Sequence, residues 1–302
     1  MMDKVPVATM ANGSELALYL HTFDGSGAGP TLGLRAGIHG DEAVGVEILR
    51  RFAERLKSLP FRGRILMLPV ANPLALQNRS RHTPDDTDRR LTGQLNEAID
   101  RHFLKRVDAV IDFHAGGYYP TVDYVYITNA EKLSRAFGSP LMYRPTLDRD
   151  GTGGWDNPRR GVMPNQPVPW VTAELGGGDV DQAPYVARGV AGIQNVMHAL
   201  GMCDGRASAR PRQTVVHEIR TLRPQNGGLL VTEAPGMGQP VRGGSVLGRL
   251  VSPHTFEEIE RFECPLEQGV MILSHQTVDV VRPADYGYMI GDLADAEREE
   301  GE

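Results

Sequence analysis

A histidine and a glutamate stand three positions apart in the stretch Gly37–Glu42, which reads GIHGDE. In the opening turn of a helix, His39 and Glu42 can point to one side, an arrangement that suits a metal ion. The pair alone is weak evidence, because the chain has nine histidines and acidic residues favour helix N-termini for electrostatic reasons. Its position strengthens the case, since an apolar run ends at Ile38 and open α/β sheets place their sites at strand ends.

A second histidine, His114, closes the apolar run in VIDFHAGG and precedes two glycines that permit close approach of a ligand. Such a strand-end histidine is more often structural than metal-binding. With His39 and Glu42 it completes three protein ligands, the number that a catalytic zinc uses while keeping a fourth position for water. Asp112 lies two residues earlier on the same strand face, where it could orient a ligand imidazole.

A glutamate, Glu174, follows another strand-like run and precedes three glycines in VTAELGGG. An ionisable side chain at the end of a buried strand is costly unless it is paired or used. In a zinc hydrolase it would be the general base that deprotonates water and then the proton donor to the leaving group. The alternative is a loop acid or a helix N-cap without a chemical role.

Two polar loops could supply substrate contacts. The segment Asn78–Gly93 concentrates arginine and aspartate and lacks apolar periodicity. It is either a solvated loop or a site for carboxylate recognition and oxyanion stabilisation. The segment Asp148–Gly161 is rich in glycine and arginine and precedes the run that holds Glu174. It is either an exposed loop or a lid.

Alternating strand-like and helix-like segments must position these residues. The strand-like runs include residues 31–38, 63–73 and 107–117, and segments of helical periodicity include 42–59, 97–106 and 183–201. Helices between buried strands predict an α/β sandwich around a largely parallel or mixed sheet.

The composition changes two-thirds of the way along the chain. Residues 204–212 are polar and arginine-rich, as in a linker, and short β-type runs punctuated by glycine and proline follow. We predict a catalytic domain over residues 1–203, a small all-β domain over 213–294 and a flexible acidic tail over 295–302. Part of the β region resembles half of a biotinyl/lipoyl-type barrel, but no lysine follows Lys132, which excludes a carrier role. Packing, homo-oligomerisation or shaping of the site entrance remain open as its role.

Bulk composition limits the partners. The 302 residues carry a formal net charge of −6 with a pI near 5.9, and the basic residues are dispersed, which argues against nucleic-acid binding. The sequence shows no leader-like or membrane-spanning apolar run, and Cys203 and Cys264 form neither a metal motif nor a disulfide framework. We expect a cytoplasmic protein that acts on a small molecule, without nucleic-acid or membrane partners.

In chain order, these residues resemble the motifs of the succinylglutamate desuccinylase/aspartoacylase family, a branch of the zinc carboxypeptidase-like fold. The resemblance covers roughly residues 30–200. Its five motifs are H-G-x-E at His39–Glu42, N-P-x-A at Asn72–Ala75, D-x-N-R at Asp86–Arg89 with Arg81 ahead of it, D-x-H at Asp112–His114, and a strand-end glutamate at Glu174. The resemblance implies an α/β/α sandwich with a mixed sheet, and many bacterial members carry a small C-terminal β domain.

The resemblance also implies roles for individual residues. His39, Glu42 and His114 would bind one zinc ion. Glu174 would activate water, and Arg81 would stabilise the tetrahedral oxyanion together with the metal. The reaction would be hydrolysis of an N-acyl amino acid, or a similar small amide, to a carboxylate and an amine.

One departure from the family pattern concerns substrate contacts. Asp88 stands where the D-x-N-R motif has asparagine, beside Arg89, which would hold a substrate carboxylate. An amide can donate to a substrate carboxylate, whereas an ionised carboxylate can only accept. Asp88 would offset the charge of Arg89 or receive a cationic group, so we predict a substrate less anionic than N-acetylaspartate, such as an N-acyl diamino acid. Asn78, Asp88 and Arg89 are the predicted substrate-binding residues.

Two other functions stay open at this point. One is a carboxypeptidase-like hydrolase that acts on a peptide or a modified metabolite. The other is a metal- or ligand-binding relative without turnover, which predicts loss of a ligand or of the base. The chain retains His39, Glu42, His114 and Glu174.

Overall fold

A computed structural model describes the chain except residues 85, 87–88, 119, 146–167, 206–210 and 300–302. Three predictions fall on these exceptions: the substrate contact of Asp88, the lid role of Asp148–Gly161, and most of the linker 204–212. They lie outside the described residues.

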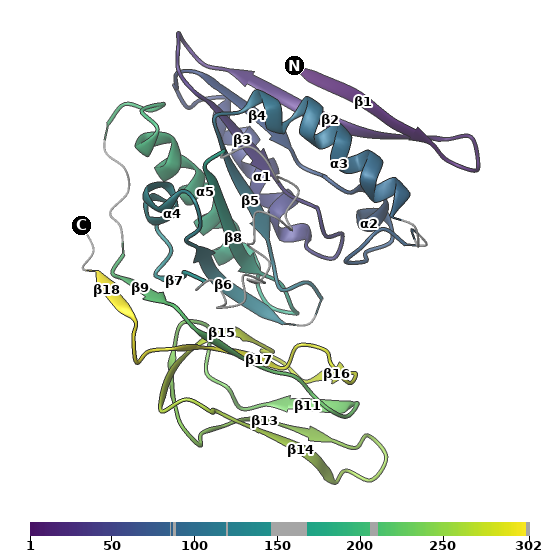
Figure 1. The fold of residues 1–302 in the computed structure, drawn as a ribbon, viewed down its shortest axis with the longest axis vertical. Helices are drawn as coiled ribbons and strands as arrows, with labels where there is room; N and C mark the ends of the chain where they lie inside the picture. The colour runs from purple at the N-terminus through teal and green to yellow at the C-terminus, as the bar shows by residue number, and fades with distance from the viewer. Residues whose placement is uncertain (85, 87–88, 119, 146–167, 206–210, 300–302) are drawn as a thin grey trace, which may run out of the picture.

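Strands and helices are interspersed through the first two-thirds of the chain, and every element that the structure describes after α5 is a strand (Figure 1). The helices are α1 (Ala43–Leu56), α2 (Pro73–Gln77), α3 (Arg90–His102), the 3-10 helix η1 (Leu104–Arg106), α4 (Glu131–Phe137) and α5 (Ala183–Ala199). The strands of this part are β1 (Met2–Thr9), β2 (Glu15–Asp24), β3 (Thr31–Arg35), β4 (Arg64–Leu68), β5 (Ala109–His114), β6 (Thr121–Tyr126), β7 (Leu141–Tyr143) and β8 (Trp170–Gly176). The strands that follow are β9 (Gln213–Val216), β10 (Ile219–Leu222), β11 (Gly228–Thr232), β12 (Pro240–Arg242), β13 (Val246–Val251), β14 (Glu258–Glu263), β15 (Gln268–Ser274), β16 (Asp279–Val281), β17 (Tyr288–Asp292) and β18 (Glu297–Glu299).

A mixed sheet of fourteen strands runs through the described part of the molecule, with β1-β2-β4-β3-β5-β8-β6-β15-β17-β10 as its main path. Its centre is parallel, because β4, β3, β5 and β8 all run the same way. On either side the neighbours β2 and β6 are antiparallel to it. The carboxyl ends of β3, β5 and β8 therefore meet at one edge, where α/β sheets bind ligands.

Helices cover both faces of this sheet, which confirms the predicted α/β/α sandwich. On one face, α1, α4 and α5 pack through their apolar positions into a large core that includes Phe52, Phe137 and Ile193. On the other face, α3 packs through Leu95 and Ile99. The helical spacing predicted over residues 42–59 marks the buried stripe of α1, whereas α3 begins at Arg90, seven residues before the predicted segment 97–106.

The C-terminal strands form two structures. A separate antiparallel sheet has the order β14-β13-β11-β16. β15 instead pairs with β6 through Leu273–Val122 and Ser274–Thr121 and so extends the large sheet. The all-β character of this region is confirmed, whereas the predicted domain boundaries and the biotinyl/lipoyl-type comparison stay predictions.

Part of the segment predicted as a flexible acidic tail is a strand in the structure. Glu297–Glu299 form β18, which pairs with β9, and Glu297 makes an ion pair with Arg135 and lies 3.2 Å from Nε2 of His217. The composition of residues 295–302 indicated fraying, but the backbone of β9 and the guanidinium of Arg135 provide partners for the strand. Among the described residues, no helix is long and apolar enough to cross a membrane.

Candidate active site

The site begins at the ends of two adjacent parallel strands. His114 ends β5 and lies opposite Glu174 of β8 in the strand register, and Asp112 lies opposite Thr172 two positions back. Paired residues on neighbouring strands share a face and lie close together, so His114 and Glu174 project side by side. The alternative of a helix N-cap is wrong for Glu174, because it lies within β8 and α5 begins only at Ala183.

The loop between β3 and α1 brings His39 and Glu42 to this strand edge. The Gly40 amide donates to the Ser80 carbonyl at 2.9 Å, which ties the loop to the segment after α2. A Cβ atom at Gly40 would collide with the backbone of Ala75, so the close approach requires glycine. α1 starts directly after Glu42, which leaves this carboxylate at the sheet edge.

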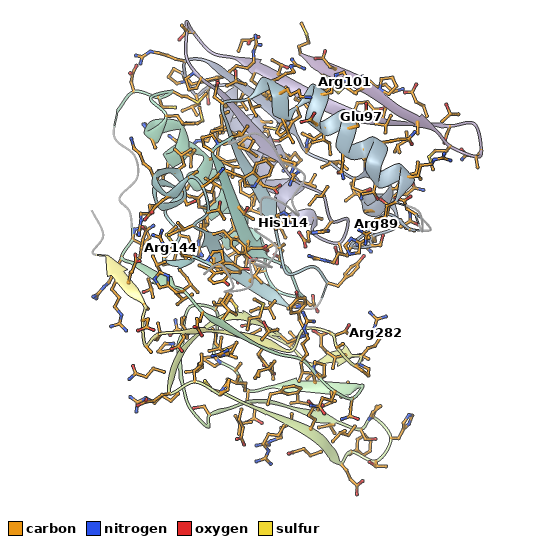
Figure 2. All side chains as sticks on the ribbon, in the orientation of Figure 1. Arg89, Glu97, Arg101, His114, Arg144 and Arg282 are labelled. Carbon is orange, nitrogen blue, oxygen red and sulfur yellow. The ribbon has the colours of Figure 1, made fainter. Side chains whose placement is uncertain are left out.

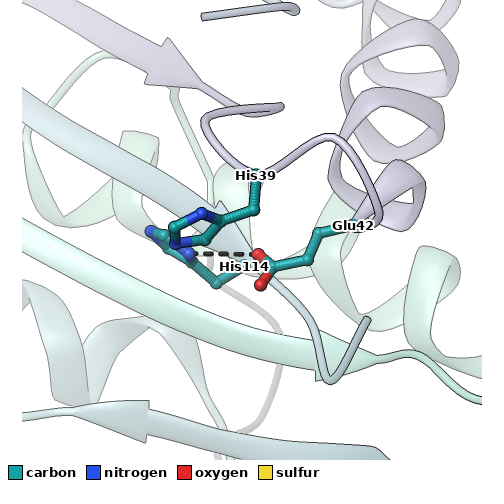
Figure 3. Close-up of side chains that lie close together, drawn as sticks. All are labelled: His39, Glu42 and His114. Carbon is teal, nitrogen blue, oxygen red and sulfur yellow. Dashed lines mark hydrogen bonds and ion pairs between the residues drawn. The ribbon is translucent and has the colours of Figure 1, made fainter. Parts of the chain in front are cut away.

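His39, Glu42 and His114 form the cluster predicted from the sequence (Figure 3). One ligand atom from each lies within 4.8 Å of the others, and the set of two imidazoles and one carboxylate is one that a catalytic zinc uses. Burial lowers the pKa of His39 to about 4, so this ring is neutral at pH 7 and can ligate a metal. The Nδ1 atom of His39 lies 2.9 Å from the Arg81 carbonyl, a contact that orients the ring. The residues therefore fit a zinc ion.

Glu42 is the most enclosed member of the cluster, with 2 % of its surface exposed. Its Oε2 accepts from the Ala115 amide and lies 3.1 Å from His114 Nδ1, and its Oε1 accepts from Arg81 Nη1 at 2.8 Å. Burial opposes ionisation, but the hydrogen bond and charge of His114, with His39 and Arg81, hold the pKa of Glu42 below its usual value. Glu42 is thus a carboxylate at neutral pH, as metal binding requires.

His114 has a carboxylate at each ring nitrogen. Nδ1 faces Glu42, and Nε2 lies 3.1 Å from Asp112 Oδ2. Burial alone would lower the pKa of His114, but Asp112 and Glu42 raise it well above its usual value. The geometry that we predicted for Asp112, a contact that orients this imidazole, is present.

The pKa of Glu174 is raised toward neutral pH, as suits a general base. Burial raises its pKa to about 8, with His114 opposing the shift and Glu42 adding to it. These influences also show that the carboxyl group lies near the three-residue cluster. A carboxylate with such a pKa can both accept and return a proton at physiological pH.

The residues predicted from the arginine-rich segment separate into different places. Arg81 reaches the cluster through Glu42, as described above. Asn78 lies at the end of α2, where its side-chain amide donates to the Leu74 carbonyl at 2.8 Å. Arg89 is exposed at the start of α3, apart from the central position of His114 (Figure 2).

Sequence reasoning missed Arg35. This arginine ends β3, its Nε donates to Asp112 Oδ1 at 2.8 Å, and its guanidinium also pairs with Asp112 Oδ2. Its signal was a cation inside the apolar run TLGLRAGI, which is costly without a partner. The pairing partner lies 77 residues away on β5, so only the sheet register identifies it.

Comparison with known proteins assigns the chain to a family. The sequence model of the succinylglutamate desuccinylase/aspartoacylase catalytic domain matches residues 28–200, more than half of the chain. The chain belongs to this family. The match begins before β3 and ends after α5, so it includes every element that carries the cluster and Glu174.

Individual relatives agree with this membership. An Nα-acetyl-L-2,4-diaminobutyric acid deacetylase of Halomonas elongata is 26% identical over 254 residues, which cover 74% of this chain and 71% of the relative. The ectoine utilization protein EutE (DoeB) of Ruegeria pomeroyi, solved with product bound, superposes with a TM-score of 0.81 at 21% identity, covering 97% of this chain and 95% of that one. An aspartoacylase family protein from Mesorhizobium loti gives a TM-score of 0.76 at 21% identity, with coverage of 97% and 95%. The two structures show the shared fold.

Proposed function

We propose that this protein is a zinc-dependent deacylase that hydrolyses the amide bond of a small N-acyl amino acid. The observation that carries the proposal is the placement of Glu174 directly opposite His114, next to a cluster with the composition of a catalytic zinc site. Family membership and the deacetylase relative support the reaction class, hydrolysis of an amide by a small-molecule amidohydrolase.

His39, Glu42 and His114 would hold the zinc ion, which when bound supplies a Lewis acid that polarises a carbonyl group and water. The chain's own part is to keep His39 and Glu42 in the protonation states that metal binding requires, whereas His114, with its raised pKa, would release a proton when the ion binds. His39 is neutral and Glu42 is ionised at pH 7, as their shifted pKa values require. The backbone carbonyl of Arg81 and the carboxylate of Asp112 orient the two rings.

Glu174 would act as the general base and then as the acid. Its carboxylate takes a proton from the attacking water, whose oxygen adds to the amide carbon. The same proton then passes to the amine nitrogen as the carbon–nitrogen bond breaks. With a pKa near 8 the group is mostly protonated at pH 7, which suits the donor step, and the positive charge of a bound zinc ion would favour the carboxylate that the first step needs.

Arg81 would stabilise the oxyanion that develops on the amide oxygen. Its guanidinium already lies at the cluster through the Nη1 contact to Glu42, and a guanidinium has five N–H donors in a planar fork. The positive charge beside the reacting carbonyl lowers the free energy of the transition state relative to the ground state.

The substrate that we propose is an N-acyl amino acid with a cationic side chain, less anionic than N-acetylaspartate. Asp88 beside Arg89 motivates this choice, together with Asn78 as a further contact. The Halomonas elongata relative, named for an acetylated diaminobutyrate, supports the same substrate class. Hydrolysis of peptides, or binding without turnover, are the rival functions.

Metal analysis and a substrate panel test the proposal together. We expect about one zinc per chain, loss of amidase activity on chelation, and recovery on adding zinc. Among N-acetyl-2,4-diaminobutyrate, N-acetylaspartate and short peptides, kcat/KM should be highest for the first. A preference for N-acetylaspartate contradicts the proposed substrate class, and a preference for peptides contradicts the deacylase function. Full zinc occupancy without turnover of any amide would favour the non-catalytic alternative.

A further inference from the structure

A buried ion pair lies directly beneath the metal-ligand candidate His114. Arg35 on β3 and Asp112 on β5 are opposite each other in the strand register and are 5 % and 2 % exposed. Removing two charges from water costs several kcal/mol per ion, so an apolar pair of similar volume would commonly stabilise the fold as well or better. Stability of the fold therefore does not explain why this buried pair is charged.

Asp112 determines which nitrogen of His114 faces the cluster. Its Oδ2 lies 3.1 Å from Nε2, and an ionised carboxylate can only accept, so Nε2 carries the proton. Nδ1 is then the nitrogen directed at Glu42, in the ring that lies 5.2 Å from the His39 ring. The carboxylate of Asp112 thereby specifies both the tautomer and the orientation of the ring when Nδ1 ligates a metal.

Arg35 determines how the Asp112 carboxylate is held. Its Nε donates to Oδ1 at 2.8 Å and its Nη2 donates to Oδ2, the same oxygen that accepts from His114. Two parallel bonds from a planar guanidinium fix the plane of a carboxylate, which a single lysine ammonium cannot do. The carboxylate is therefore not free to rotate away from the imidazole.

Arg35 is itself fixed from a third strand. Its guanidinium carbon lies 4.8 Å from the centre of the Trp170 ring on β8, a cation–π contact in a desolvated setting. Trp170 precedes Glu174 by four positions on the same strand. The indole, the guanidinium, the carboxylate and the imidazole thus form one stack of contacts across β8, β3 and β5.

From this geometry we propose that Arg35 is a positioning residue for the metal site: it holds Asp112 so that His114 presents Nδ1, rather than Nε2, to the ion. This inference rests on the proposed function, because it needs His114 to be a ligand. Its effect appears in metal affinity and coordination, before any catalytic step.

The test compares zinc affinity and stability in four variants of the full chain: R35M, R35K, the double variant R35M/D112N and the control R188M. Arg188 forms an ion pair with Asp123 of β6. Asp123 lies opposite Leu175 in the strand register, and Leu175 packs into the core on the face of the sheet opposite to His114. This ion pair is therefore a control that does not contact the metal-ligand candidates. Zinc dissociation constants come from competition with a chromophoric chelator, and stability comes from thermal unfolding of the metal-free proteins. The absorption spectrum of bound Co²⁺ reports the ligand geometry.

We expect R35M to weaken zinc binding by about tenfold, the lower end of the range known for direct partners of metal ligands, because Arg35 acts through Asp112. R35K keeps the charge but not the bidentate contact, so its affinity should fall between those of R35M and the wild type. R188M should lower the melting temperature and leave zinc affinity within about twofold. The Co²⁺ spectrum should change in R35M and not in R188M.

The double variant separates positioning from burial of charge. R35M/D112N removes both charges and should recover stability relative to R35M, but the asparagine amide can donate to Nε2 and move the imidazole proton to Nδ1. Its zinc affinity should stay low. If R35M or the double variant binds zinc as tightly as the wild type does, the proposed role of Arg35 is overturned. If R35M does not fold, the same result in R35K overturns it. Failure of the wild-type protein to bind zinc would instead overturn the proposed function as well.

Discussion

Two histidines, the partly buried His114 and the fully buried His275, each lie against an aspartate, yet their surroundings differ in what they allow. His275 is 1 % exposed, with Nδ1 2.8 Å from Asp279 Oδ2 and Nε2 2.8 Å from the Tyr286 carbonyl. Its ring therefore ties together the residues after β15. His114 has Asp112 on one side, but its other nitrogen faces Glu42, which lies 72 positions away in the chain.

The two histidines differ in what contacts the ring nitrogen that faces away from the aspartate. At His275 that nitrogen contacts a backbone carbonyl eleven residues away, which closes a local turn. At His114 it contacts a second ionisable group and lies close to a second imidazole. Within the described ranges, His39, Glu42 and His114 are the group whose donor atoms converge as a metal requires. A position beside a carboxylate is thus common to a structural and a functional histidine. What distinguishes the functional one is that donor atoms from other segments of the chain converge on it.

The largest expected effect comes from removing each histidine in turn. H114A should abolish activity and weaken zinc binding by more than the roughly 100-fold seen when only a partner of a ligand is lost. H275A should keep zinc stoichiometry and kcat while losing about 1–3 kcal/mol of unfolding free energy, because buried polar groups lose their partner. Elemental analysis, kinetics and urea unfolding on both variants check this. If H275A lost its zinc, the conclusion that His275 is structural and His114 is a metal ligand would be contradicted.

A smaller effect is expected at Glu174, the neighbour that His114 has across the sheet. E174Q should bind zinc as the wild type does, since Glu174 is not a member of the cluster, but kcat should fall by about 10²–10⁴-fold through loss of the general base. Steady-state kinetics with N-acetyl-2,4-diaminobutyrate and a zinc titration measure the two quantities. Wild-type kcat in E174Q would show that another group moves the proton.

The effect with the least bearing on activity concerns stability against pH in the metal-free protein. Glu174 has a pKa of about 8 in the fold against its usual value of 4.5, so its ionisation destabilises the folded state. The cost is absent below about pH 4.5, grows as the pH rises, and is complete above about pH 8. E174Q lacks this cost. Its unfolding free energy relative to wild type should therefore increase from pH 5 to pH 9, as measured by urea unfolding. A difference that stays constant over this range contradicts the raised pKa.

Much of the fold and site follows from local sequence. Apolar runs and helical spacing predict the central strands β3, β4 and β5 and the helices α1 and α5, because burial imposes those periods on each segment separately. His39, Glu42, His114 and Glu174 stand out as polar residues at the ends of such runs. The structure brings the first three together, and it places Glu174 beside them.

Other features depend on pairing between distant segments. The extension of the large sheet by β15, and the pairing of β18 with β9, need a register between strands that no local pattern specifies. Asn78 is polar in sequence, and only its contact with the Leu74 carbonyl shows that it also closes α2.

The sequence by itself determined which residue types are available for chemistry and the order in which they follow their strands. Tertiary structure decided which of them act together. Arg35 and Asp112 are 77 residues apart, and Glu42 and His114 are 72 apart, so their contacts exist only because parallel strands align in one register. Burial at that strand edge then shifts each pKa, since desolvation and neighbouring charge are properties of the assembled site and not of any one residue.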